Sequence, residues 1–231
     1  MASTSEAEMN ALLTQIDDIL RSRRRVQSHP ARSALLRMIG CIAVFGLLYG
    51  AVMGAFGGVT GPRFWQVVNA GLKVPLLLLG TSLIAWPSFF VMNALAGLRN
   101  DFFRATAALM ASQAGLAIVL ASLAPLTIVW YASSGDYDNA LRFNGGMFAI
   151  ACFAGQWLLR DHYRVLVERD PRHRWMFWFW LGLYVFIAIQ MAWVMRPFVG
   201  DPSAPVEFFR RDKWGNAYMV VAKLIYSLIA H

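Results

Sequence analysis

Apolar residues gather into long runs along this chain, and charged residues stand in short blocks between the runs. A run of roughly 20 residues is long enough for a helix to cross a hydrocarbon core ~30 Å thick. The pattern therefore predicts an all-α fold, a polytopic transmembrane helix bundle with five spans. These spans are expected at about residues 38–59, 70–95, 105–131, 141–159 and 175–195.

A polar leader of residues 1–37 precedes the predicted bundle at 38–195. Residues 5–8 have the capping-box pattern, and the apolar residues after them recur on one helical face, which predicts a short N-terminal amphipathic helix. The leader continues into a basic cluster formed by Arg21, Arg23, Arg24 and Arg25. Such a cluster sets topology or contacts anionic lipid head groups, and we favour the topology signal.

Arginine placement predicts which side of the membrane each connecting segment faces. The leader and the loops after the second and fourth spans hold thirteen arginines, whereas the alternate loops hold only Arg63 and Arg142. Lys and Arg accumulate in cytoplasmic segments. We therefore expect a multi-pass protein of the inner (cytoplasmic) membrane of a bacterium, with a cytoplasmic N-terminus and an extracytoplasmic C-terminus.

The tail, residues 196–231, is rich in proline near its start and apolar near its end. Residues 214–231 are short for a span and carry Lys223 in the middle, while their apolar positions recur near helical spacing. This segment is either a sixth span or an amphipathic helix at the interface or on a partner. We favour five spans and a terminal amphipathic helix.

Small residues recur at helical spacing within several spans. In the first span, every fourth residue is a glycine, namely Gly46, Gly50, Gly54 and Gly58. The third span continues the pattern with Ala107, Ala111 and Gly115. Small residues let the backbones of neighbouring membrane helices approach closely. The pattern predicts helix packing, within one chain or between chains, and packing within the chain is the simpler interpretation.

Composition agrees with a membrane protein and argues against nucleic-acid binding. Only 15% of residues are charged, against roughly 25% in soluble domains. The net charge of +8 comes from basic residues that flank apolar runs instead of forming one basic stripe with interleaved aromatics. The two cysteines, Cys41 and Cys152, lie inside apolar runs and are interpreted as packing residues.

Polar side chains at membrane depth are costly unless they find partners, so each is a candidate functional residue. The strongest candidates for an intramembrane polar site are Lys73, Gln113, Asn144 and Gln190. The five expected spans contain no Asp or Glu. This composition argues against proton-coupled transport but is compatible with passive conduction.

The sequence contains no recognisable catalytic motif. It has no nucleophile elbow and no phosphate-binding loop, and its histidines lack the spacing of a helical metal site. Asp161 and His162 would be the best acid–base pair for a membrane enzyme acting on lipids. We instead interpret their charged segment as an extension of the fourth span, and we expect no enzyme activity, no cofactor and no metal.

Two stretches resemble bacterial relatives of the Yip membrane-protein family. They are KVPLLLLGTSLIAWPS at residues 73–88 and GLRNDFF at residues 97–103. The resemblance covers about residues 40–195 and implies a five-span bundle with a cytoplasmic N-terminus. It also implies a short Gly-x-x-x-x-Phe loop that leads into a small-residue helix. Eukaryotic members are associated with small GTPases and vesicle traffic; for this chain the resemblance implies the architecture only.

Together these features predict a non-enzymatic membrane scaffold, or an accessory subunit of a larger membrane assembly. Its expected partners are membrane lipids and other membrane proteins, or further copies of itself. The alternative is a small channel or transporter with a polar path near Lys73.

Overall fold

The computed structural model describes residues 32–202 and 204–209, together with Thr14 and Asp17. These residues form helices and no strand, which confirms the all-α prediction. The long helices are α2 (Arg32–Gly54), α3 (Phe64–Leu95), α4 (Phe102–Ser133), α5 (Tyr137–Arg169) and α6 (His173–Val194). The predicted amphipathic leader, the cluster of Arg21, Arg23, Arg24 and Arg25, and the terminal segment 214–231 lie outside the described residues.

Four helical segments are long and apolar enough to cross a membrane, which fits a membrane-embedded, multi-pass protein. They are Arg32–Gly54, Phe64–Leu95, Arg99–Ser133 and His173–Val194. Helix α5, where a span was expected at 141–159, has 33 residues but is less apolar than the other helices. Length and composition in the described part of the chain therefore support four spans. Helix α5 is as long as the others but contains both apolar and charged residues, and it is not among the four.

Several helix ends differ from the sequence-based boundaries. Helix α2 ends at Gly54, and Gly57 and Gly58 beyond it adopt positive φ angles of 81° and 116°. Residues with side chains rarely adopt such angles, so these glycines end the helix. Gly58 was predicted to continue the packing series and does not: it is exposed, and a Cβ there would have no atom within 4 Å.

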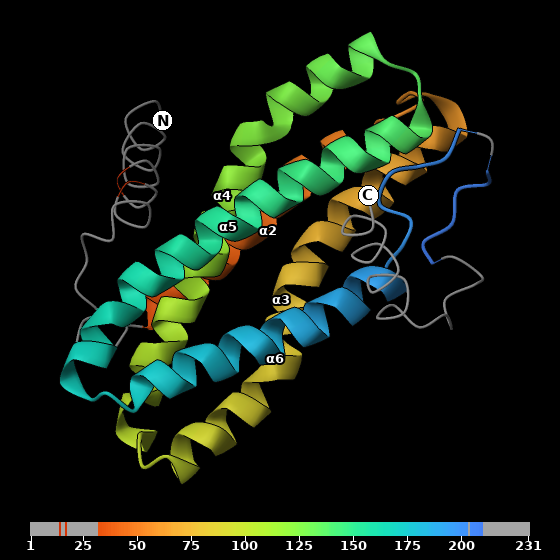
Figure 1. Ribbon diagram of the computed structural model, residues 1–231. Coiled ribbons are helices and arrows are strands. Elements are labelled where there is room, and N and C mark those ends of the chain that lie inside the picture. Colours follow the sequence, from red (N-terminus) through yellow and green to blue (C-terminus); the bar gives the residue numbers. More distant parts are fainter. Residues whose placement is uncertain (1–13, 15–16, 18–31, 203, 210–231) are drawn as a thin grey trace, which may run out of the picture.

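The helices are arranged around a central pair, α2 and α4. Helix α3 packs on α2 and carries α6, while α5 packs along α4 (Figure 1). Helices α5 and α6 meet at the turn of residues 170–172 and diverge from it, with few contacts along the rest of their length. At one end of the bundle, the end of α2, the start of α3 and the segment that follows α6 lie together.

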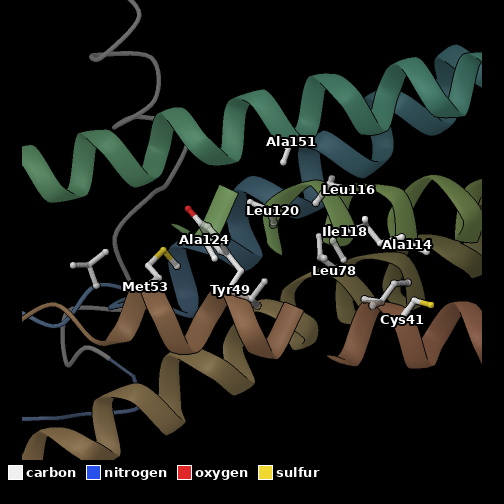
Figure 2. Packing of buried hydrophobic residues seen from close by; sticks show 14 of the residues in the cluster. Cys41, Tyr49, Met53, Leu78, Ala114, Leu116, Ile118, Leu120, Ala124 and Ala151 are labelled. Carbon is white, nitrogen blue, oxygen red and sulfur yellow. The ribbon is translucent and has the colours of Figure 1, made fainter. Parts of the chain in front are cut away.

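Apolar side chains from four helices fill the half of the bundle near that end. Tyr49 and Met53 of α2 meet Leu78 of α3, Leu120 of α4 and Ala151 of α5 (Figure 2). A second cluster fills the opposite half and is richer in aromatic rings. Its buried members include Phe89, Phe102, Leu159, Tyr163 and Trp180.

Three glycines of the predicted series lie at the contact between α2 and α3. A Cβ at Gly46 would lie 3.2 Å from the backbone nitrogen of Pro75, and one at Gly50 would lie 2.9 Å from the Cα of Gly71. One at Gly54 would lie 2.7 Å from the carbonyl oxygen of Gln66. On α4, the predicted packing residues Ala107, Ala111 and Gly115 are all buried.

Candidate functional site

An irregular segment closes the end of the bundle at which α6 finishes. Residues 195–202, which we call the strap, leave the last turn of α6 and run back along the first part of α3. Val199 and Gly200 in the strap are buried. A Cβ at Gly200 would lie 2.5 Å from Cγ of Gln66, so the strap is seated closely against α3.

Side chains at the start of α3 hold the strap by its backbone carbonyls. Lys73 Nζ donates to the oxygen of Pro197 at 2.5 Å, and Gln66 Nε2 donates to that of Phe198 at 3.3 Å. Arg63 just before α3 donates to the oxygens of residues 201 and 202. A buried backbone carbonyl needs a hydrogen-bond donor, because it has lost the hydrogen bonds that it makes with water in the unfolded chain. These donors meet that requirement.

Lys73 is the most unusual member of this site, because its side chain is fully buried. Its ammonium group also lies 5.0 Å from the ring centroid of Phe208, which is within range of a cation–π contact. No carboxylate of the described residues forms an ion pair with it. The positive charge is therefore held by a carbonyl dipole and an aromatic face.

A small cavity lies between the strap and α3, with a volume of about 70 Å³. It is lined by Arg63, Gln66, Pro197, Gly200, Asp201, Ala204, Pro205, Val206 and Glu207. Pockets for small organic molecules are larger, roughly 300–1,000 Å³. The cavity therefore has room for solvent or a small ion beside the strap, but not for an organic substrate.

Asn144 lies in a second polar cluster, inside the apolar core. Its Nδ2 donates to the hydroxyl of Tyr131 at 2.7 Å, and its Oδ1 accepts from the hydroxyl of Tyr49 at 3.2 Å. Tyr131 in turn donates to the carbonyl oxygen of Met53 at 3.1 Å. This network ties α2, α4 and α5 together.

The four predicted polar candidates do not form one site. Gln113 accepts a hydrogen bond from Tyr184 at 2.8 Å, which joins α4 to α6, and Gln190 is half-buried. Within the part of the chain that the structure describes, no hydrogen bond joins any two of Lys73, Gln113, Asn144 and Gln190. Three of them instead hold different sets of segments together: Lys73 joins α3 to the strap, Gln113 joins α4 to α6, and Asn144 joins α2, α4 and α5.

We expect Asn144→Leu to lower the free energy of unfolding by about 1–2 kcal/mol, because the hydroxyls of the buried Tyr49 and the half-buried Tyr131 would lose their shared partner. Unfolding in detergent, followed by circular dichroism against denaturant, measures this change. Gln190→Leu is the matched control, since Gln190 makes no hydrogen bond with any of the described residues, and it should change stability by less than about 0.5 kcal/mol. Equal effects of the two substitutions would contradict the network.

A third group of polar residues joins the loop before α4 to the turn between α5 and α6. Asp101 accepts a hydrogen bond from Arg104 at 2.9 Å, and its other oxygen lies 3.5 Å from Nε2 of the fully buried His173. The hydroxyl of Tyr163 lies 3.4 Å from Nδ1 of the same histidine. Burial, together with the charge of nearby Asp101, raises the pKa of Tyr163. The cluster holds helix ends together.

Helix α5 continues unbroken through Asp161 and His162, as expected for an extension of the fourth span. The Nδ1 of His162 lies 2.8 Å from the carbonyl oxygen of Leu158 in its own helix, and burial lowers the pKa of His162. Asp161 is exposed, whereas His162 is buried and bonded within its own helix. Among the described residues, no group of three or more His, Cys, Asp or Glu is placed to bind a metal ion.

Sequence reasoning missed the residues that complete these clusters. Gln66 lies just before the second expected span. The tyrosines Tyr49, Tyr131 and Tyr184 lie in apolar runs, where tyrosine is usual as an interface residue. A buried tyrosine hydroxyl needs a partner. A search for tyrosines away from the span ends would have identified Tyr49 and Tyr184.

Comparison with protein-family models, curated proteins and solved structures finds no match to this chain. The resemblance to the Yip family therefore stays a prediction.

Proposed function

We propose that this protein is a non-enzymatic integral membrane scaffold, or an accessory subunit of a larger membrane assembly. One observation carries the proposal: the polar side chains at membrane depth serve contacts between segments of the protein. Lys73 holds the strap, Asn144 joins three helices, and Gln113 joins α4 to α6. A protein built for conduction would direct some of these groups toward a common path.

The proposal includes a Yip-like bundle of five membrane crossings in the inner membrane of a bacterium, with α5 as the fifth. The arginine distribution supports a cytoplasmic N-terminus and, with five crossings, a strap on the extracytoplasmic side. The partners would be membrane lipids and other membrane proteins or further copies of this chain.

A small channel or transporter is the second candidate. The buried ammonium of Lys73, with no carboxylate partner among the described residues, supports this alternative, as does the small cavity beside the strap. The pairing of Gln113 and Asn144 with neighbouring helices supports the scaffold instead.

Purification from native membranes in a mild detergent tests the scaffold. We expect the tagged full-length protein to carry a second membrane protein, or another copy of itself, at constant stoichiometry through two chromatographic steps. The same membranes without the tagged chain serve as the control. Recovery of an isolated monomer alone, from membranes and from lipid nanodiscs, would contradict the proposed function.

A further inference from the structure

Paired charges hold together the end of the bundle that lies opposite the strap. Arg172, in the turn between α5 and α6, binds both carboxylate oxygens of Asp170 and donates to the carbonyl oxygen of Ala96 at 3.0 Å. Arg104 at the start of α4 donates to Asp101 at 2.9 Å. These contacts bring the loop after α3 against the turn before α6, and they use the carboxylates of both Asp101 and Asp170.

Three arginines on the same segments are left without a carboxylate. Arg99 lies in the loop before α4, Arg169 is the last residue of α5, and Arg174 lies in the first turn of α6; all three are exposed. Within the described residues, none of the three forms an ion pair or a side-chain hydrogen bond. Glu168, next to Arg169, is already paired with Arg164 at 2.8 Å. This end of the bundle therefore carries three positive charges that internal ion pairs do not neutralise.

These charges lie where the apolar helices end. The segments Phe64–Leu95, Arg99–Ser133 and His173–Val194 are apolar enough to cross a membrane, and each has one end here. Beside the arginines, Trp175 is 81% exposed, and tryptophan prefers the level of the lipid head groups. Helices α4 and α6 both begin at this end, so the positive ends of their dipoles add to the arginines. An anion bound here would lie at head-group level.

We propose that Arg99, Arg169 and Arg174 bind the head group of an anionic phospholipid through its phosphate. The inference rests on the proposed function, in which membrane lipids are partners, and it names the class of lipid. Guanidinium groups form charge-assisted hydrogen bonds with phosphate oxygens. A zwitterionic lipid offers the same phosphate together with a positive group, which the arginines repel. The exposed Trp175 and the adjoining span ends favour a lipid over an acidic segment of a partner protein.

Lipid retained by the purified protein tests the site. The full chain is reconstituted in vesicles of equimolar phosphatidylglycerol and phosphatidylcholine, extracted in a mild detergent and purified, and the retained lipids are measured by mass spectrometry. The native protein should retain phosphatidylglycerol in roughly tenfold excess over phosphatidylcholine, because each arginine near the bilayer surface strengthens the binding of an anionic lipid. A variant with Arg99→Gln, Arg169→Gln and Arg174→Gln should retain the two lipids equally.

The matched control carries Arg37→Gln, Arg142→Gln and Arg160→Gln. These arginines are also exposed and form no ion pair with the described residues, so the control loses the same net charge at other positions. Arg160, for example, lies about 14 Å along α5 from Arg169. The control should keep the excess of phosphatidylglycerol.

Single substitutions make the test independent of how well the triple variant folds. Each of Arg99→Gln, Arg169→Gln and Arg174→Gln should lower the excess roughly two- to fivefold. Circular dichroism and the elution volume on size exclusion show whether each variant keeps the native fold.

The inference is overturned if the native protein retains both lipids equally, or if the control loses the excess as the site variant does. It is also overturned if inorganic phosphate at the same concentration displaces the lipid, or if the site variant keeps its lipid but loses a co-purified protein. A constant protein partner with equal retention of the two lipids would reject the lipid site alone. An excess of phosphatidylglycerol on an isolated monomer would reject the scaffold alone.

Discussion

Replacing Gly50 by alanine is expected to lower the free energy of unfolding by about 3 kcal/mol. A Cβ at this position would lie 2.9 Å from the Cα of Gly71 and closer still to the carbonyl oxygen of Ala70. Both neighbours are backbone atoms of α3, which cannot rotate away as a side chain would. Helices α2 and α3 would therefore have to separate along their whole contact.

Gly40→Ala is the matched control, because Gly40 lies in the same helix and a Cβ there would meet no atom within 4 Å. Alanine favours a helix interior over glycine by about 0.5–1 kcal/mol, so this control should leave stability unchanged or slightly raised. Unfolding of both variants in the same detergent, with the native protein alongside, measures the difference. Equal stabilities of Gly40→Ala and Gly50→Ala would show that α2 and α3 do not pack through their glycines.

Run length and small-residue spacing were sufficient to predict much of this fold. A helix needs a fixed number of residues to cross a hydrocarbon core, so apolar runs predict the helices themselves. The spacing placed Gly46, Gly50 and Gly54 on one face, and the structure brings that face against α3. It failed at Gly58, because a regular series of glycines does not reveal where positive φ angles end a helix.

The candidate site was less predictable than the fold. Lys73 was identified because placing a cation within an apolar run is energetically costly. This cost can be recognised from the residue and its neighbours in sequence alone. Its partner is the carbonyl of Pro197, 124 residues away. Every residue carries a carbonyl, so only the path of the chain after α6 determines which one Lys73 meets. The same reason hid the role of Gln66.

We expect Lys73→Met to release the strap from α3 while leaving the helices folded. Methionine has a similar length but no donor, so the carbonyl of Pro197 would be left unpaired at a cost of about 1.5–3 kcal/mol. Removal of a buried charge offsets part of the effect on global stability, since burying an ammonium group is itself unfavourable. The change should therefore appear mainly as local opening of the strap.

A cysteine at Val199, which is only 1% exposed, reports that opening. In a chain with Cys41→Ala and Cys152→Ser, a hydrophilic maleimide should label Val199→Cys roughly 10 to 100 times faster when Lys73→Met is added. Gln113→Met is the control, because it removes a buried hydrogen bond to Tyr184 instead of one to the strap, and it should leave the labelling rate unchanged.

Comparison of the native protein with Lys73→Met also distinguishes the scaffold from the channel. If the protein is a scaffold and Lys73 only holds the strap against α3, Lys73→Met should speed labelling at Val199→Cys. Proteoliposomes should then show no ion flux, with or without the substitution. A conducting path predicts flux in the native protein that Lys73→Met abolishes. Flux that depends on Lys73, with an unchanged labelling rate at Val199→Cys, would mean that the ammonium group serves permeation and that the strap is held by Gln66 and Arg63 alone.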